Sequence, residues 1–224
     1  MRAPISVIVP TLNAQEHLGA CLGALMPGVE AGLIRELIVS DGGSSDATVE
    51  IAKAWGAELV KGRPSRGAQL ARGCSIAKGR WLLVIHADTI LTPEWVGAVI
   101  THIDADDAGW FRLAFDNGGL AGRLVAGWAN LRSRFGLPYG DQGLLVPATL
   151  YEHVGGYPSQ PLMEDVAIAR ALKGRLKEID AVAVTSAVRY KKQGWIRRGT
   201  RNLWTLMRYF TGASPQHLAD SYRS

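Results

Sequence analysis

The chain has few of the features that mark secreted or membrane-spanning proteins. Only two cysteines, Cys21 and Cys74, occur in its 224 residues, and they form no CxxC pair. Disulfide scaffolds and cysteine-rich zinc sites are therefore excluded, and a reducing compartment is favoured. No apolar run approaches the ~18 residues that a spanning helix needs, and the N-terminus lacks a signal-peptide layout. We therefore expect a cytoplasmic protein.

The sequence also lacks the best-known motifs of nucleotide-binding and hydrolytic enzymes. It contains no GxxxxGK[ST] loop, no GxGxxG turn and no GxSxG elbow. Walker-type ATPases, dinucleotide-dependent dehydrogenases and α/β-hydrolases therefore lose their main support. There is no internal repeat or low-complexity segment. The length suits one large domain.

Acidic residues are missing from one long stretch near the C-terminus. Residues 181–219 contain no Asp or Glu but seven Lys and Arg residues, although the whole chain has 25 basic and 20 acidic residues. Because the positive charge is local, a nucleic-acid partner is not expected. A local basic segment suits the phosphates of a small ligand or an anionic membrane surface.

Short apolar strands alternate with helical segments in the first half of the chain. Strand patterns occur at residues 5–9, 36–40, 57–60 and 81–85, and helical patterns at 14–25, 46–55, 68–77 and after Thr92. Strands that are apolar on both faces and joined by helices indicate a parallel sheet covered on both sides. The second half is less regular, with strand patterns at 109–115, 142–146 and 176–184 and helical patterns at 121–135, 163–172 and 195–210.

Polar, turn-forming residues follow three of the expected strands. They are the segments PTLN (10–13), DGGSSD (41–46) and HADT (86–89). A turn with a helix cap explains any one of them. Ligands of open α/β sheets bind beyond the carboxyl ends of the strands, so three such segments at one edge predict a ligand site.

The ordered set VIVPTLN, DGGSSDAT, HADT and MEDVAIARAL resembles family 2 glycosyltransferases of the GT-A fold, over about residues 5–186. The segments GDQG, VGGYP and PLMED are similar to a compact bacterial subgroup, the radical-SAM/selenodomain-associated transferase 2 type, which has a link to arsenosugar biosynthesis. The resemblance implies an α/β fold with a Rossmann-like, mixed, mostly parallel sheet and helices on both faces. It implies a catalytic domain at 1–186, with a donor-binding half at 1–104 and an acceptor-side half at 105–186. Residues 187–224 would form a basic C-terminal arm of the same structural unit.

The resemblance also implies where a nucleotide-sugar donor would bind. Asp41 would face the base, commonly a uracil imide, whose N–H suits an acceptor-only carboxylate; a turn role is the alternative. Gly42 would let the backbone approach the ligand. Arg66, which opens a helix, would pair with the diphosphate, or remain a surface arginine. The implied donor site is completed by Pro10, Thr11, Asn13, Glu16, His86, Ala87 and Asp88.

His86-Ala87-Asp88 occupies the position of the family's DXD motif. Asp88 would hold a Mg²⁺ or Mn²⁺ ion that offsets charge on the leaving diphosphate. The first acid of the motif is replaced by His86, whose imidazole suits Mn²⁺ better than Mg²⁺. A ribose contact or a partly buried strand-end histidine is the alternative, so metal identity stays open.

Glu164-Asp165 matches the acidic pair that supplies the catalytic base in this family. Asp165 would take the proton of the acceptor hydroxyl, and Glu164 would support it or contact the acceptor. Favourable charge in a first helical turn is the alternative. Asp141 and Gln142 would line the acceptor side. Trp110 and Tyr139 would stack on sugars or pack in the core.

The basic arm contains an amphipathic pattern at residues 195–210. One face would carry Ile196, Gly199, Leu203, Leu206, Met207 and Phe210, and the opposite face Arg197, Arg201 and Arg208. The apolar face would pack on the catalytic domain and leave the arginines in water, or bind an anionic membrane peripherally. A flap that pairs with the donor diphosphate is a third interpretation, with the candidates Arg189, Lys191 and Lys192.

The sequence therefore predicts an inverting glycosyltransferase that uses a nucleotide-diphosphate sugar, of UDP type, with metal assistance. The alternatives are a sugar nucleotidyltransferase and a non-catalytic nucleotide-sugar binding protein. The sugar, the acceptor and the oligomeric state stay open.

Overall fold

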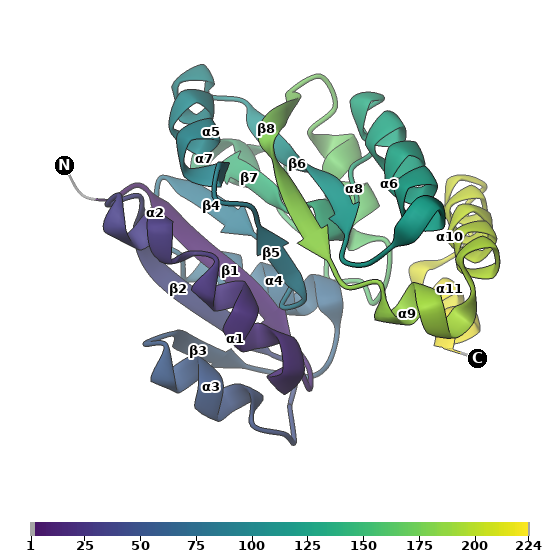
Figure 1. Ribbon diagram of the computed structural model, residues 1–224, viewed down its shortest axis with the longest axis horizontal. Helices are drawn as coiled ribbons and strands as arrows, with labels where there is room; N and C mark the ends of the chain where they lie inside the picture. The colour runs from purple at the N-terminus through teal and green to yellow at the C-terminus, as the bar shows by residue number, and fades with distance from the viewer. Residues whose placement is uncertain (1–2, 224) are drawn as a thin grey trace.

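The computed structural model describes residues 3–223 and contains one eight-stranded sheet with helices packed around it (Figure 1). The elements are, in chain order, β1 (Ile5–Thr11), α1 (Gln15–Gly23), α2 (Met26–Glu30), β2 (Ile34–Asp41), α3 (Thr48–Ala54), β3 (Glu58–Lys61), α4 (Arg66–Ser75), β4 (Trp81–Val84), β5 (Thr89–Leu91), α5 (Trp95–His102), η1 (Ile103–Ala105), β6 (Ala108–Phe115), α6 (Gly119–Arg134), η2 (Gly140–Gln142), β7 (Leu144–Pro147), α7 (Ala148–His153), α8 (Glu164–Ala171), β8 (Leu176–Thr185), α9 (Val188–Gln193), α10 (Trp195–Phe210) and α11 (Pro215–Arg223).

The strand order is β3-β2-β1-β4-β7-β6-β8-β5. Strands β3, β2, β1 and β4 are parallel to their neighbours, as the first half of the sequence predicts. Beyond β4 the sheet becomes mixed, because β7 pairs antiparallel with β4 and β6, while β8 is parallel to β6. The expected mixed, mostly parallel sheet is confirmed.

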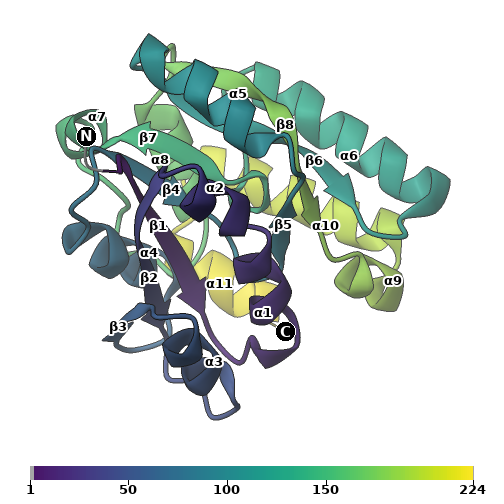
Figure 2. The same ribbon diagram turned by 60° about the vertical axis from the view of Figure 1, so that its left-hand side comes forward.

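Two apolar cores lie on opposite faces of the sheet because successive residues of a strand point to opposite sides. Val7 faces a core built with α1, α3 and α5. Its neighbour Ile8 faces a second core, built with α4, α7 and α8. Figure 2 shows these two helical layers on either side of the sheet, and the expected covering of both faces is confirmed.

The strands of the first half differ from the predicted ranges by only one or two residues at their ends. The three-residue strand β5 was not predicted, since it begins at the last residue of HADT and pairs with β8, which is distant in sequence. Residue 142 was expected in a strand but lies in η2. Strand β7 therefore begins at Leu144, after that turn, and not at residue 142 as predicted.

The C-terminal arm packs at one end of the sheet as α9, α10 and α11 (Figure 1). The interpretation that α10 packs its apolar face on the catalytic domain is wrong. Leu206 alone of that face is buried, against Met163 and Val166. On the basic face Arg197 is exposed, whereas Arg201 and Arg208 are partly buried. Arg201 donates hydrogen bonds to carbonyl oxygens of α11, including that of Tyr222, and stacks on the Tyr222 ring. No helix within residues 3–223 is long and apolar enough to span a membrane.

Candidate active site

The loops that follow β1 and β2 are tied together by their own polar side chains. The Asp41 carboxylate, almost fully buried, accepts hydrogen bonds from the Thr11 and Ser44 hydroxyls and from the N–H groups of Gly43 and Ser44. Burial alone would raise the pKa of Asp41, but these hydrogen bonds outweigh it and lower that pKa. Asn13, in the left-handed region, accepts a hydrogen bond from the N–H of Ser45. Asp41 therefore organises the loop, and its expected contact with a base stays a prediction.

Gln69 of α4 holds together the ends of β1 and β2. It was not among the site residues predicted from the sequence. Its buried amide donates hydrogen bonds to the carbonyl oxygens of Thr11 and Ser40, at 2.8 and 3.0 Å. These bonds join the ends of β1 and β2 to the start of α4. Because Arg66 begins that helix, the bridge positions Arg66 relative to the strand ends.

Two adjoining cavities open at this edge, and we label them donor-side and acceptor-side after the roles that the sequence resemblance implies. The donor-side groove is lined by the ends of β1 and β4 and the start of α4, including Pro10, Thr11, Asn13, Arg66, His86, Ala87 and Asp88. The acceptor-side cavity is lined by η2, the start of α8 and the arm, including Tyr139, Asp141, Asp165, Arg189 and Tyr190. Arg66, His86 and Asp88 line both. A ligand that fills both cavities would pass these three side chains.

Asp165 lies in the acceptor-side cavity with its carboxylate held in place. Its Oδ2 accepts a hydrogen bond of 2.9 Å from the N–H of Gly140, and its Oδ1 accepts one from the N–H of Val166. Met163, which immediately precedes the acidic pair, has a positive φ of 63°. That conformation is costly for a residue with a Cβ, and it turns the chain into α8 where the pair begins.

Glu164 is buried and lines neither the donor-side groove nor the acceptor-side cavity. Its side chain is 1% exposed, and its Oε1 lies 3.6 Å from Nε of Arg66. Burial and the charge of Asp165 raise the pKa of Glu164 to about 7, against the opposing effect of Arg66. Glu164 therefore pairs with Arg66, and its expected role of supporting the base or contacting the acceptor stays a prediction.

His86 lies against η2, where only glycine fits. A Cβ on Gly140 would come within 2.6 Å of Nε2 of His86. Burial and the positive charge of Arg66 lower the pKa of His86 to about 4, although Asp88 and Asp165 act in the opposite direction. His86 is therefore neutral near pH 7 and has a nitrogen lone pair available to a metal ion or a hydrogen-bond donor.

Asp141 adds a third carboxyl group to the acceptor-side cavity. Its Oδ1 is buried without a hydrogen-bond partner in the described chain. Burial raises the pKa of Asp141 to about 6; Arg132 opposes this, and Asp165 and Asp88 reinforce it. Asp141 lines the cavity, and a carboxyl oxygen without a partner beside a cavity suits a hydroxyl group of a ligand.

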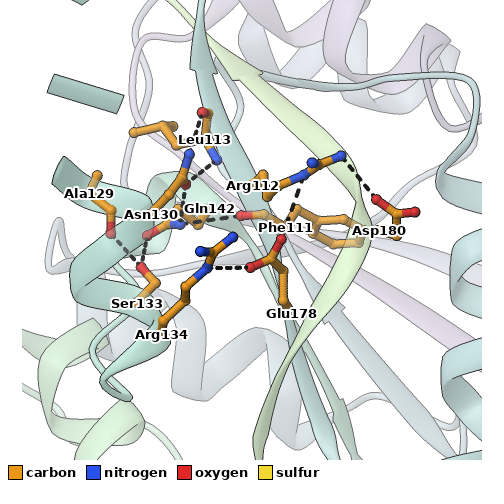
Figure 3. Close-up of polar contacts among 10 residues, drawn as sticks. All are labelled: Phe111, Arg112, Leu113, Ala129, Asn130, Ser133, Arg134, Gln142, Glu178 and Asp180. Atoms are coloured by element: carbon orange, nitrogen blue, oxygen red, sulfur yellow. Dashed lines mark hydrogen bonds and ion pairs between the residues drawn. The ribbon is translucent and has the colours of Figure 1, made fainter. Parts of the chain in front are cut away.

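The acceptor-side loop is anchored by Gln142, which lies beneath the cavity and does not line it. Its fully buried amide donates to the carbonyl of Phe111 and to Oδ1 of Asn130, and accepts from the hydroxyl of Ser133. Figure 3 shows this network between α6 and β6. The network fixes η2, and with it the N–H of Gly140 that holds Asp165.

Residues 6–142, more than half of the chain, match the model of the family described as Glycosyl transferase family 2. The chain belongs to that family.

Curated relatives of this family 2 chain match it over a limited part of their length. Glucosyl-3-phosphoglycerate synthase of Mycolicibacterium paratuberculosis is 32% identical over 111 residues, which cover 43% of this chain and 33% of that protein. A PGL/p-HBAD biosynthesis glycosyltransferase of Mycobacterium bovis is 38% identical over 99 residues, 41% of this chain and 38% of that protein. The matches thus span about a third of the length of these relatives.

Solved structures show that the family 2 chain has the GT-A fold. The S. aureus TarS 1-349 complex with UDP-GlcNAc superimposes with a TM-score of 0.63 at 17% identity, over 82% of this chain and 58% of that one. Mycobacterium tuberculosis glucosyl-3-phosphoglycerate synthase, solved with Mn²⁺, UDP and glucosyl-3-phosphoglycerate, gives 0.56 at 22% identity, over 82% and 70%. These comparisons confirm the expected family and fold; the narrower bacterial subgroup stays a prediction.

Some of the residues expected from sequence do not reach either of the two cavities. Glu16 is exposed on α1, Asp41 and Gly42 lie within the β2 loop, and Lys191 and Lys192 point into solvent from α9. Trp110 is buried in the core, as its alternative role predicts. Of the expected flap residues, Arg189 alone lines the cavities.

The arm also contributes cavity residues that sequence reasoning missed. Tyr190 stacks on Trp195, and its hydroxyl accepts a hydrogen bond from Asn202, which in turn accepts one from the Tyr222 hydroxyl. Arg198 lies over the Tyr190 ring. Apart from Trp195, these side chains line the acceptor-side cavity, together with Phe115, Thr185 and Ser186.

Proposed function

We propose that the chain transfers a sugar from a nucleotide-diphosphate donor, of UDP type, to a hydroxyl acceptor with inversion at C1. The observation that carries this proposal is the placement of Asp165. Its carboxylate is fixed by the Gly140 N–H in a cavity that adjoins the donor-side groove at Arg66, His86 and Asp88. A base beside the acceptor and cationic groups beside the diphosphate are what a single displacement needs.

In the proposed reaction Asp165 accepts the proton of the acceptor hydroxyl as its oxygen attacks C1. The bond between C1 and the diphosphate oxygen breaks, and its electron pair leaves with the nucleotide. Arg66 and Arg189, which line both cavities, offset the charge that develops on the diphosphate. One carboxylate suffices because no covalent glycosyl-enzyme forms.

The donor set at the DXD position fits a divalent cation, Mn²⁺ or Mg²⁺, although the chain supplies few ligands. Asp88 offers carboxylate oxygens and neutral His86 a nitrogen. Among residues 3–223 no group of three His, Cys, Asp or Glu residues converges to hold a metal ion, so diphosphate oxygens and water would complete the shell. The bound cation would supply Lewis-acid neutralisation of the leaving group.

UDP release tests the proposal directly. We expect slow hydrolytic release from UDP-glucose or UDP-N-acetylglucosamine, stimulated by Mn²⁺ and lost in Asp165→Asn. Tight UDP binding without release, at any cation concentration, would instead indicate a non-catalytic binding protein. Release of pyrophosphate from a nucleoside triphosphate and a sugar phosphate would indicate a nucleotidyltransferase. The arsenosugar link and a cytoplasmic location stay predictions.

A further inference from the structure

Helix α6 exposes a continuous apolar stripe. The stripe residues recur at helical spacing and are 47% to 77% exposed: Leu120, Leu124, Trp128, Leu131 and Phe135. The buried residues of the same helix, Gly122, Ala126, Ala129 and Ser133, lie on its opposite side, against the sheet. At 100° per residue the two sets are about half a turn apart. Stripes of this kind on a single surface helix mark an interaction site.

Helix α10 exposes a second stripe beside the first. Its members are 44% to 83% exposed: Ile196, Leu203, Trp204, Met207 and Phe210. The two helices contact each other where Trp195 packs at Gly118 and Gly122, and they lie side by side in Figures 1 and 2. Neighbouring helices thus each leave their most apolar side uncovered.

The charged residues of the two helices that carry the stripes are all basic. Near the end of α6, Arg134 pairs with Glu178 of β8 at 3.1 Å. Residues 117–140 contain no Asp or Glu, and neither do residues 181–219. Exposed cations lie on the same helices and on adjacent α9: Arg123 of α6, Arg197 of α10, and Lys191 and Lys192. An apolar side on helices whose own charged residues are all basic is complementary to a surface that is both apolar and anionic.

We propose that α6 and α10 dock the protein on an anionic phospholipid surface. Trp128, Trp204 and Phe135 would enter the headgroup region, where aromatic side chains are favoured. Arg123 and Arg197 would pair with lipid phosphates. A second copy of the chain fits less well, because a two-fold interface sets the same patch against itself, and these helices offer no carboxylate to meet the arginines.

Docking would bring the acceptor-side cavity close to the bilayer. Arg198 and Asn202, on the side of α10 away from the stripe, line that cavity, and a helix with its side chains is about 10–12 Å across. Resting on the proposed function, this placement implies a hydroxyl acceptor carried on a membrane lipid.

Vesicle flotation tests the docking without relying on activity. We expect the full chain to float at low salt with vesicles in which about a third of the lipid is phosphatidylglycerol, and not with pure phosphatidylcholine. Combined Leu124→Ser, Trp128→Ser, Trp204→Ser and Met207→Ser substitutions should lower the partition coefficient by at least about tenfold. UDP affinity and Tm should stay at wild-type values, since these side chains are exposed.

The matched control changes exposed apolar residues elsewhere. Val29 of α2 and Ile100 of α5 are 48% and 47% exposed, and a Val29→Ser, Ile100→Ser variant should float like wild type. The proposal is overturned if wild type does not float at low salt, or if the fourfold variant floats as well as wild type. It is also overturned if those substitutions only convert a dimer to a monomer. Retained UDP release in any of these cases would leave the transferase proposal standing.

Discussion

Replacing Asp165 by asparagine separates the role of its charge from its role in the fold. The carboxylate accepts two backbone hydrogen bonds, of 2.9 Å from Gly140 and 2.8 Å from Val166. An amide of the same size keeps one acceptor oxygen and loses the other, which costs about 1.5–3 kcal/mol for a bond to a charged group. The loss of a negative charge beside Glu164, whose pKa Asp165 raises, offsets part of that cost. We therefore expect a net loss of about 1–2 kcal/mol and a fall in Tm of about 2–8 °C.

The rate effect should be larger than the stability effect. A general base contributes about 10²–10⁴-fold, equivalent to about 2.7–5.4 kcal/mol of transition-state stabilisation. Asparagine accepts no proton at neutral pH, so UDP release per folded molecule should fall by that factor while UDP affinity is kept. The measurements are initial rates of UDP release, calorimetric UDP binding and thermal unfolding on the same preparation.

Asp180→Asn is the matched control. The Asp180 carboxylate is 91% exposed and pairs with Arg112 at 3.0 Å, outside the cavities. Surface pairs of this kind contribute about 0–1 kcal/mol, so the variant should keep both Tm and rate. Wild-type turnover by Asp165→Asn would refute the assignment of the base. Loss of folding, with activity per folded molecule unchanged, would make Asp165 structural.

Three further predictions concern the neighbouring groups. Asp88→Ala should weaken UDP binding at least about tenfold in Mn²⁺ but little in chelator, as measured by titration calorimetry; unchanged Mn²⁺-dependent affinity would exclude Asp88 as a metal ligand. Glu164 has a pKa raised from 4.5 to about 7, so its protonated form favours the folded state, and its contribution to stability is lost as pH rises between these values. As pH rises through this range, the free energy of unfolding of wild type should therefore fall relative to that of Glu164→Gln, as measured by denaturant titration. A difference between the two proteins that does not change with pH would contradict the raised pKa of Glu164. Gln142→Leu should lower the free energy of unfolding by about 2–3 kcal/mol by leaving buried partners unsatisfied, and an unchanged midpoint in urea would refute that anchoring role.

The comparison with wild type matters for the pH experiment because other groups titrate nearby. The pKa of His86 is lowered to about 4 by burial and Arg66, so its contribution rises with pH, between about 4 and 6.5. Asp141, with a pKa raised to about 6 by burial, contributes in the same direction as Glu164. Only the difference between wild type and Glu164→Gln isolates the buried glutamate.

The donor side of the site could be predicted because its residues follow directly from the strand pattern. Parallel strands end at one edge, so PTLN after β1 and HADT after β4 meet there whatever the details of packing. His86 and Asp88 line both cavities for this reason. The acidic pair Glu164-Asp165 follows no strand, and it was predicted only from its resemblance to the motif of the family.

The buried amides could not be predicted because a lone glutamine has no local signature. Gln69 bridges segments far from it in sequence, the ends of β1 and β2. Gln142 was expected to line the acceptor side, because it adjoins Asp141. Both residues lie in the tight 3₁₀ turn η2, in which successive side chains point in different directions. The side chain of Gln142 therefore points into the protein, toward Ser133 and Asn130.

The arm shows why amphipathic pattern alone does not decide burial. The pattern of α10 correctly divides the helix into an apolar and a basic side, but it contains no information about which side meets the protein. Arg201 and Asn202 bond to Tyr222 of α11, and these polar contacts turn the helix so that Ile196 and Met207 are exposed. One helix thus closes the acceptor-side cavity with its polar residues and presents its apolar residues outward. If the outward side binds lipid, docking and cavity closure depend on the same helix, so substitutions at Asn202 that loosen the arm should weaken vesicle binding as well as transfer.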